Sequence, residues 1–330
     1  MFPSAPILPQ SAFLSLSPEA GLHLALRAAG VMPGDYVLVP ALCTSELAGA
    51  LRRAEAVPIL IDVHPQDWLL DLDLLEQFLM GHTLVNDQDT LVMRRDQKPV
   101  RALVAVHLNG VPADLNRLRF IAHRFFIPLI EDACEATGAQ YHQQSVGLFG
   151  DSGVFSLDNH PYYPGEKGAL LLSQRAEALQ KLKDDQLLAR FPEEYQLVHL
   201  GLDQLPALQK ARAEHQLIQE RIDRFFQGIP DIAWQQVPAL AEQACHTMTF
   251  TAQRPDELKA WLTEAGITTA SFTPPLHRLP AFQHSTYIRI HDHARTLFES
   301  AIRIPDAGQK TEEEWAALAD LLRRFYGLIG

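Results

Sequence analysis

The 330-residue sequence predicts an α/β protein with a large domain built on a mostly parallel sheet, followed by a smaller α+β domain. Short β-rich runs alternate with helical patterns through the first half of the chain, which is typical of βαβ units. These runs are apolar throughout, as expected of strands buried on both faces. With 47% hydrophobic residues, the chain also has enough apolar material for a sizeable core.

A helix that starts at Ser17 precedes the first βαβ unit. Ser17 suits the N-cap, Pro18 suits the first turn, and Gly30 follows the last residue of the apolar repeat. The runs YVLVP and VPILID, residues 36–40 and 57–62, are predicted strands, and the segment between them has a helical pattern. The alternation predicts two neighbouring parallel strands.

A second unit repeats this order along the chain. Residues 102–107 form a predicted strand, a helix is expected from about 112 to 125, and residues 127–131 form the next strand. The polar tract 82–100 is expected to be a loop or a small hairpin at the sheet edge. Two further apolar runs, VFSL and ALLLS, follow Gly150.

The second half of the chain has the pattern of a smaller domain. A helical repeat covers about 206–226, and it is followed by the strand HTMTFTA, the helix PDELKAWLTEAG and a terminal helix. We therefore expect a large domain at 1–205 and a small domain at 206–330.

Charge and cysteine content exclude several classes of protein. A formal net charge of -12 argues against nucleic acid or an anionic membrane as partner. The chain has no signal-peptide pattern at its start and no apolar stretch of about 18 residues, so a cytoplasmic protein is expected. Cys43, Cys134 and Cys245 lie far apart without C-x-x-C spacing, so neither a disulfide framework nor a metal site is expected.

Three candidate site residues stand at predicted strand ends, where ligands bind in α/β sheets. Asp132 could hold a cationic ring nitrogen, although a strand-end aspartate also serves as a turn former or helix cap. His107 could contact a ligand or be a satisfied interior histidine. Ser156 could bind phosphate through its hydroxyl, but a single serine specifies little.

The order of the motifs resembles one family along nearly the whole chain. SPEAGLHLALRAAGVMPGDYVLVP is similar to the family's SGTAALHLAL segment and the strand that follows it. HLNGVPADL resembles HLYGQPADM, and IPLIEDACEATGAQYHQQSVGLFGDSGVFSL resembles a long block that ends in G-x-F-G-D-x-G-x-F-S-F. The C-terminal segments PDELKAWLTEAGITTASFTPPLH and IPDAGQKTEEEWAALADLL match as well. The chain is thus identified as resembling the DegT/DnrJ/EryC1/StrS sugar aminotransferases.

The resemblance implies a type I fold of pyridoxal phosphate (PLP)-dependent aminotransferases, a homodimer and a nucleotide-sugar ligand. PLP or pyridoxamine phosphate is the implied cofactor, and biosynthesis of a surface polysaccharide or secondary metabolite the implied pathway. Asp132 would pair with the pyridinium nitrogen, Glu135 would lie near the ring hydroxyl, and Ser156 would contact the phosphate. The remaining candidate cofactor-binding residues are Ser17, Thr44 and His107.

Two elements of the family's cofactor site are replaced in this sequence. Pro18-Glu19 stands where the family has a phosphate-binding Gly-Thr, which removes an N–H donor and adds a negative charge. Thr44 stands where an aromatic residue covers the PLP ring. Both replacements weaken the expected cofactor contacts.

The Schiff-base lysine of the family has no counterpart by position. It follows the serine of F-S-F by five residues and precedes the glycine of G-E-G-G by five, but this loop is one residue shorter. Counting from Ser156 reaches Pro161, and counting back from Gly165 reaches His160. The nearest lysine is Lys167, at the start of the next predicted strand.

Three functional hypotheses follow from this departure. The chain is a noncatalytic or altered-ligand homologue that keeps the scaffold, or an aminotransferase whose lysine lies elsewhere, with Lys167 as the remote candidate. In the third hypothesis it resembles sugar-nucleotide 3-dehydratases that use histidine and free pyridoxamine phosphate, with His160 as base.

Overall fold

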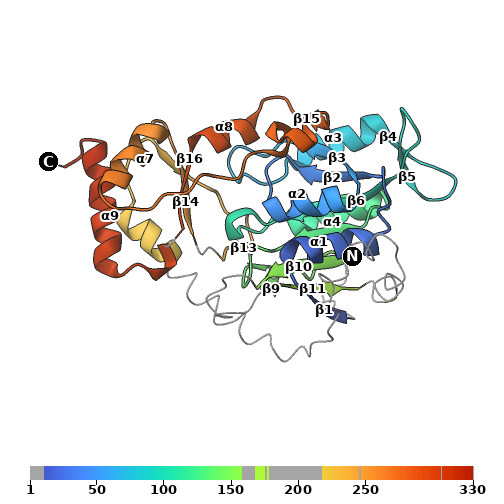
Figure 1. Ribbon diagram of the computed structural model, residues 1–330, viewed down its shortest axis with the longest axis horizontal. Helices are drawn as coiled ribbons and strands as arrows, with labels where there is room; N and C mark the ends of the chain where they lie inside the picture. Colours follow the sequence, from blue (N-terminus) through green and yellow to red (C-terminus); the bar gives the residue numbers. More distant parts are fainter. Residues whose placement is uncertain are drawn as a thin grey trace.

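The computed structural model describes residues 11–157, 168–174, 177, 218–244, 247–305 and 307–329. Figure 1 shows a large α/β unit and, beside it, a smaller unit formed by C-terminal elements. The domain boundary expected near residue 205 lies outside the described residues.

A single eight-stranded sheet forms the centre of the large unit. Every neighbouring pair is parallel except those that involve β11. The prediction of an α/β protein with a mostly parallel sheet is therefore confirmed. In spatial order the strands are β1 (Ser11–Ser15), β11 (Ala169–Ser173), β10 (Ser152–Ser156), β7 (Leu129–Asp132), β6 (Val100–Val106), β2 (Tyr36–Pro40), β3 (Val57–Ile61) and β15 (Thr286–Ile288).

Helices cover both faces of this sheet, as a buried parallel sheet requires. The strand order turns back after β3, and right-handed crossovers then place the first two helices on one face and the next two on the other. Side chains cap each helix at its N-terminus: Ser17, Thr44, Asp71 and Asp114. The four helices are α1 (Pro18–Ala28), α2 (Ser45–Arg53), α3 (Leu72–His82) and α4 (Leu115–Arg124).

The smaller unit has its own sheet and its own core. Three antiparallel strands pack against two helices around the buried rings of Phe250 and Trp315. A capping box at Thr311 and Glu314 begins the last helix. The elements are β12 (Ile232–Trp234), β14 (Met248–Ala252), β16 (Ala301–Ile304), α7 (Pro255–Glu264) and α9 (Glu312–Phe325).

Segment 272–301 returns from the small unit to the large one. It carries β15, which adds to the edge of the large sheet, and α8 (His293–Ser300), which packs with the large core. Asp62, at the end of β3, accepts hydrogen bonds from the backbone N–H groups of His293 and Ala294 and from the Tyr287 hydroxyl. These bonds join the returning segment to the sheet.

The remaining elements are short. The tract 82–100 contains a two-stranded hairpin, as expected, with β4 (Thr83–Val85) and β5 (Leu91–Met93). A small sheet joins β8 (Gln140–Tyr141), β9 (Gln144–Ser145) and β13 (Ala241–Glu242), and the 3-10 turns are η1 (Leu108–Gly110), η6 (Leu276–Arg278), η7 (Pro280–Phe282) and η8 (Ala307–Gln309). Among the described residues, no helix is long and apolar enough to cross a membrane.

Candidate functional site

The predicted site residues gather at the carboxyl edge of the large sheet. Asp132 ends β7 and Ser156 ends β10, while Thr44 follows β2 and Ser17 follows β1. Because β1, β10, β7 and β2 run in the same direction, their carboxyl ends lie at one edge. The strand-end argument from the sequence therefore identifies one side of the molecule.

Asp132 is a buried hydrogen-bond acceptor in the middle of this edge. Its carboxylate is almost completely buried, and its Oδ1 accepts from the backbone N–H of Cys134 at 3.2 Å. Its Oδ2 accepts from the hydroxyl of Thr44 at 2.8 Å. Burial raises the pKa of the Asp132 carboxyl, and the hydrogen bonds from Cys134 and Thr44 oppose that rise.

Glu135 belongs to a polar network that joins the two units. Its Oε2 accepts from the backbone N–H of Asn109 at 2.8 Å, and its Oε1 accepts from Arg303 Nη1 at 3.2 Å. Arg303 Nη2 donates to Asn109 Oδ1 at 2.6 Å, and Asn109 Nδ2 donates to Gln235 Oε1 at 2.9 Å. The guanidinium of Arg303 also lies over the ring of Phe272. Strand β16 of the small unit is thereby bonded to the loops after β6 and β7.

Sequence reasoning missed three members of this network. Arg303 alternates with apolar residues on β16, a pattern that usually marks a solvent-facing position, and it gives no hint of a distant partner. Gln235 follows a short strand in a polar stretch. Asn109 has a left-handed φ of 55°, which asparagine tolerates better than most residues. Only the tertiary fold brings these three side chains to Glu135.

The N-terminus of α1 is poorly suited to bind an anion. Ser17 Oγ accepts from the backbone N–H of Ala20 at 3.1 Å, and Pro18 has no N–H to offer. Glu19 places a carboxylate in the first turn, where it pairs with Arg53 of α2. That carboxylate lies so close to Gly49 that an added Cβ there would overlap it. This helix end therefore carries a carboxylate held in an ion pair, and it lacks the N–H of residue 18.

His107 and Glu131 form a fully buried pair below the edge. The His107 ring contacts Glu131 Oε2 through Nε2 at 3.1 Å, and its Nδ1 accepts from the backbone N–H of Ala113 at 3.0 Å. The geometry is that of a satisfied interior histidine, one of the two alternatives for this residue. Glu131 accepts three further hydrogen bonds, from the backbone N–H groups of Gly147, Phe149 and Gly150.

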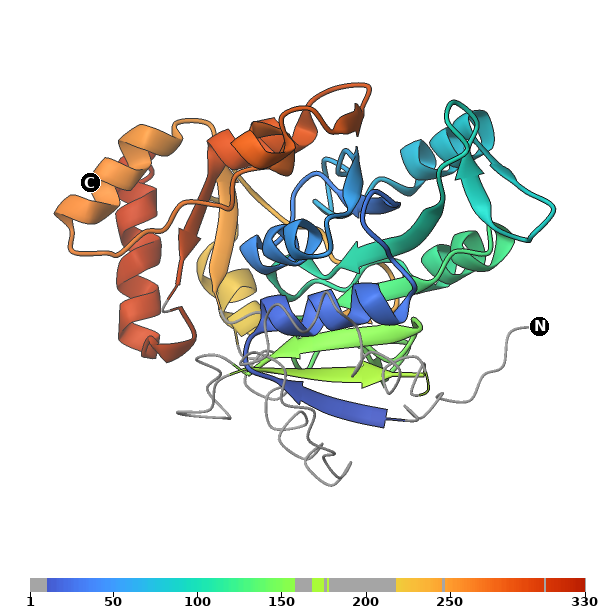
Figure 2. The same ribbon diagram turned by 45° about the vertical axis from the view of Figure 1, so that its right-hand side comes forward.

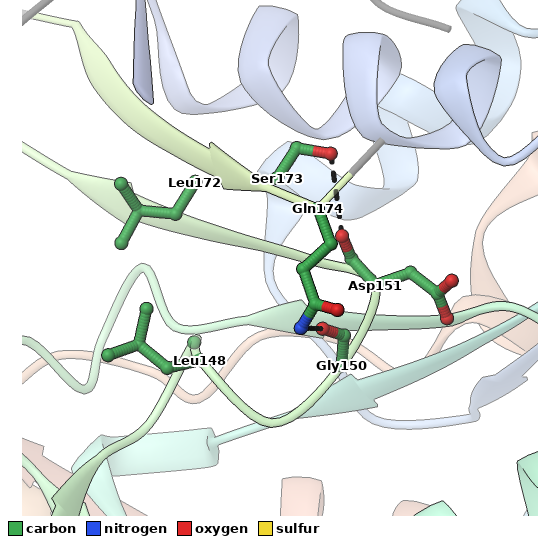
Figure 3. Close-up of a pocket in the computed structure, with 7 residues that line it drawn as sticks. Leu148, Gly150, Asp151, Leu172, Ser173 and Gln174 are labelled. Atoms are coloured by element: carbon green, nitrogen blue, oxygen red, sulfur yellow. Dashed lines mark hydrogen bonds between the residues drawn. The ribbon is translucent and has the colours of Figure 1, made fainter. Parts of the chain in front are cut away.

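A small pocket lies beside the loop that Glu131 holds (Figure 3). Its volume of about 10 Å³ leaves room for roughly one water molecule. The amide of Gln174 donates to the carbonyl of Gly150 at 3.1 Å, and the hydroxyl of Ser173 donates to the carbonyl of Asp151 at 3.4 Å. These contacts pack the loop against β11, so the pocket is a packing gap.

His160 and Lys167 both lie outside the described residues. The residues that flank their segment, Leu157 and Gly168, are joined by a backbone hydrogen bond of 2.9 Å at the carboxyl edge. Lysines within the described ranges are Lys98, Lys259 and Lys310, which lie after the β4–β5 hairpin, on α7 and before α9. None of these three described lysines therefore lies on a loop at the carboxyl edge of the sheet, where Asp132 is.

The described residues fit PLP at one end only. Asp132 offers a buried acceptor of the kind a pyridinium nitrogen needs. At the α1 end, where the resemblance places the phosphate, Pro18 offers no N–H, and the carboxylate of Glu19 is engaged by Arg53. Thr44 hydrogen-bonds to Asp132 and offers no ring face. The site also holds no metal candidate among the described residues, because no group of three ligating side chains occurs there.

Comparison with known proteins identifies a family whose pattern this chain matches. The profile of the DegT/DnrJ/EryC1/StrS aminotransferase family matches residues 16–183 and 197–323. A "pleiotropic regulatory protein" of Geobacillus stearothermophilus is 27% identical, with 92% of this chain and 82% of that protein covered. A UDP-N-acetyl-3-dehydro-alpha-D-glucosamine 3-aminotransferase of Acidithiobacillus ferrooxidans is 28% identical, with 92% and 81% covered.

Two solved structures share the fold of this chain. A DegT DnrJ EryC1 StrS aminotransferase from Brucella abortus superposes with a TM-score of 0.80 at 21% identity, covering 97% of this chain and 87% of that one. DesV of S. venezuelae, solved with a ketimine intermediate, gives 0.77 at 24% identity, covering 96% and 85%. The type I aminotransferase fold expected from the sequence is thus confirmed.

Proposed function

This chain belongs to the DegT/DnrJ/EryC1/StrS aminotransferase family, and we propose that it binds a nucleotide sugar without ordinary lysine-anchored transamination. The main support is the pair of groups at the carboxyl edge: Thr44 bonded to Asp132, and Glu19 fixed at the N-terminus of α1. We further propose a cytoplasmic homodimer with domains at 1–205 and 206–330, in polysaccharide or secondary-metabolite biosynthesis.

The proposed ligand class rests on the activities of the relatives. One relative is named for a UDP-linked aminosugar, and another, from Streptomyces venezuelae, is a dTDP-3-amino-3,4,6-trideoxy-alpha-D-glucose transaminase. A nucleotide sugar carries a diphosphate and polar hydroxyls, for which the carboxyl edge offers polar side chains from several loops. We include Ser156 and the Asn109–Arg303 network among the candidate contacts.

The family's cofactor supplies an electron sink when it is bound to such a site. In this chain, Asp132 would accept a hydrogen bond from the ring nitrogen of PLP or pyridoxamine phosphate. Glu135 is held in place by Asn109 and Arg303, on the side assigned to the ring hydroxyl. Because the α1 end lacks the N–H donor of residue 18 and has its carboxylate Glu19 paired with Arg53, we derive no catalytic step through the cofactor.

Because Asp132 is retained as a buried acceptor, a second candidate function keeps a catalytic use of the cofactor. In that candidate, unanchored pyridoxamine phosphate binds near Asp132, and His160 moves the proton. The remote candidate is an imine at Lys167. Both assignments depend on residues outside the described ranges, so they stay proposals that variants must test.

Restoring the replaced residues tests the proposal directly. The variant Pro18→Gly/Glu19→Thr/Thr44→Tyr/His160→Lys restores the residue types of the family. The first two substitutions restore the phosphate-binding Gly-Thr, and Thr44→Tyr restores the aromatic residue over the ring. His160→Lys places a lysine at one of the two positions reached by counting. We expect this variant, and not the parent, to form a borohydride-reducible adduct with PLP, mapped to position 160. An adduct on Lys167 in the parent, lost in Lys167→Ala, would contradict the proposal.

Ligand binding is tested separately by thermal denaturation with UDP-N-acetylglucosamine. A ligand that binds only the folded protein raises its melting temperature, and the rise grows with concentration. We expect a rise in the parent that is reduced in Arg303→Met. No rise at millimolar ligand, in the parent or the restored variant, would argue against the nucleotide-sugar class.

A further inference from the structure

A second, larger cavity lies on the opposite side of the large unit. Its volume is about 360 Å³, within the range of small-molecule sites. It lies between the end of α3, the turn after hairpin β4–β5 and the edge strand β15; Figure 2 shows α3 and the hairpin together, away from the small unit. Helix α3 runs back from the end of β3, so its last residues lie toward the amino edge, opposite Asp132.

The floor of this cavity is apolar and its rim is basic. Phe78 and Met93 are buried side chains of the floor. The exposed ring of His82 is stacked on Phe78, with centroids 5.1 Å apart and planes at 25°. An imidazole held flat against another ring offers its outer face to a planar group.

Two arginines supply the positive charge of the rim. Arg95 is oriented by Tyr36, because its Nη2 donates to the Tyr36 hydroxyl at 2.7 Å and its guanidinium lies 5.3 Å from the ring centroid. Asp96 lies 3.6 Å from Arg95 Nε and offsets part of that charge. Arg94 is exposed and has no ion pair with any described residue. In a chain of net charge -12, an exposed arginine beside a cavity attracts anions to that position.

Gly81 leaves the cavity open at the end of α3. It lies in the last turn of α3, and an added Cβ would meet no atom within 4 Å. Its φ is not in the left-handed region, so neither backbone conformation nor packing requires glycine there. Glycine lowers helix stability relative to alanine, and here it leaves the backbone open to the cavity.

We propose that this cavity is a binding site for a small organic phosphate with a flat apolar portion, such as a nucleoside monophosphate. The phosphate contacts Arg94 and Arg95, and the flat portion lies on the His82 ring over the apolar floor. Arginine suits such a phosphate because its planar guanidinium can donate two parallel hydrogen bonds. The site is independent of Asp132 and of the proposed function.

Calorimetric titration of the full chain with AMP, at low ionic strength, tests this proposal. Gly81→Leu places a side chain in the cavity at a position where an added Cβ meets no atom within 4 Å, and its melting temperature is measured to separate lost binding from unfolding. We expect Gly81→Leu and Arg94→Glu each to weaken AMP binding by about tenfold or more. Arg324→Glu, which reverses an exposed charge on α9 outside the cavity, should leave it unchanged.

Inorganic phosphate serves as the second probe in the same experiment. If the flat portion contributes, phosphate alone binds about tenfold more weakly than AMP. The proposal is overturned if AMP does not bind at millimolar concentration, if Gly81→Leu binds it as tightly as the parent, or if phosphate and AMP bind equally. Equal effects of Arg94→Glu and Arg324→Glu would also overturn it, because they would indicate general charge attraction.

Discussion

At the residue scale, the hydrogen bond from Thr44 to Asp132 defines the candidate site. The hydroxyl of Thr44 donates to the buried carboxylate, and the short side chain has no ring face with which to cover a cofactor ring. Thr44 also caps α2 by accepting from the backbone N–H of Leu47 at 3.2 Å. The same side chain thus stabilises a helix end and partly satisfies the charged group beneath it.

Asp132 should make the stability of the protein depend on pH in a defined direction. Its folded-state pKa is raised above the ordinary value of 3.8, mainly by burial, so the folded state binds the proton more tightly than the unfolded state. The contribution of Asp132 to stability therefore falls as pH rises from below 3.8 through the raised pKa, and the loss is complete above it.

Asp132→Asn removes this charge, so the difference in unfolding free energy between variant and parent should shift in favour of the variant as pH rises. The measurement is urea denaturation of both proteins from pH 3.5 to 8. Parallel stability curves over that range would show that the Asp132 carboxyl titrates as it does in the unfolded chain. Glu264→Gln, on the exposed face of α7, is the matched control.

The sequence predicts the position of Asp132 and not its partners. The apolar run before Glu131-Asp132 is sufficient to place both residues at a strand end. The two side chains then diverge, because successive residues of a strand point to opposite faces. Glu131 turns toward His107 and the loop at Gly147, while Asp132 turns toward Thr44, and no local pattern distinguishes these surroundings.

At the element scale, most of the sequence block QSVGLFGDSGVFS holds the sheet together, and only its last residue, Ser156, is a candidate ligand contact. The loop before β10 donates its backbone N–H groups to the Glu131 carboxylate. Strand β10 passes so close to that loop that a Cβ at Gly153 would overlap the Gly147 backbone. The glycines of the block are therefore explained by close approach and by a buried acceptor.

Glu131→Gln should destabilise the protein by about 2 to 4 kcal/mol, because a buried charged acceptor of several hydrogen bonds becomes a neutral amide. The N–H₂ group of the glutamine is itself a donor, so it cannot accept the hydrogen bonds that backbone N–H groups give to Glu131. Urea denaturation followed by tryptophan fluorescence measures the loss. A change below about 0.5 kcal/mol, the usual effect of a surface substitution, would remove Glu131 from this structural role.

Gly153→Ala should cost about 1 to 3 kcal/mol, because the backbone that it would overlap cannot move as a side chain can. Gly81→Ala is the matched control, since its Cβ meets open space, and it should stabilise the protein by about 0.5 to 1 kcal/mol. The two glycine variants are compared by thermal denaturation. Similar melting temperatures would contradict the close-approach explanation for Gly153.

At the scale of the whole molecule, Arg303 connects the small unit to the candidate site. Its guanidinium bonds to Glu135 and Asn109, which follow two adjacent strands of the large sheet. Arg303 and Glu135 are both mostly buried, so their interaction is less screened by solvent than a surface pair. The position of the small unit and the geometry of Glu135 are therefore coupled.

A double-mutant cycle with Arg303→Met and Glu135→Gln should give a coupling energy of about 1 to 2 kcal/mol. The exposed pair Arg254 and Glu257 on α7, 3.4 Å apart, is the matched control and should give less than about 0.5 kcal/mol. Unfolding free energies of the single and double variants supply both values. Equal coupling in the two cycles would mean that Arg303 does not join the units.

The sequence could not predict how segment 272–301 returns to the large unit. Its strand β15 has only three residues and no alternation that specifies a partner, yet it pairs with β3 across more than 200 residues of sequence. The contacts that hold it, from Asp62 to Tyr287 and to the start of α8, are all long-range. Local periodicity was enough for the helices and for the central strands, where burial is continuous.

The most direct test of the proposed loss of lysine anchoring is a PLP titration of the purified protein, followed by borohydride reduction and peptide mapping. We expect no lysine of the parent chain to become covalently labelled, and weak noncovalent PLP binding that Asp132→Asn weakens further. A stoichiometric adduct on Lys167, or on any other lysine, would contradict the account and restore an ordinary aminotransferase.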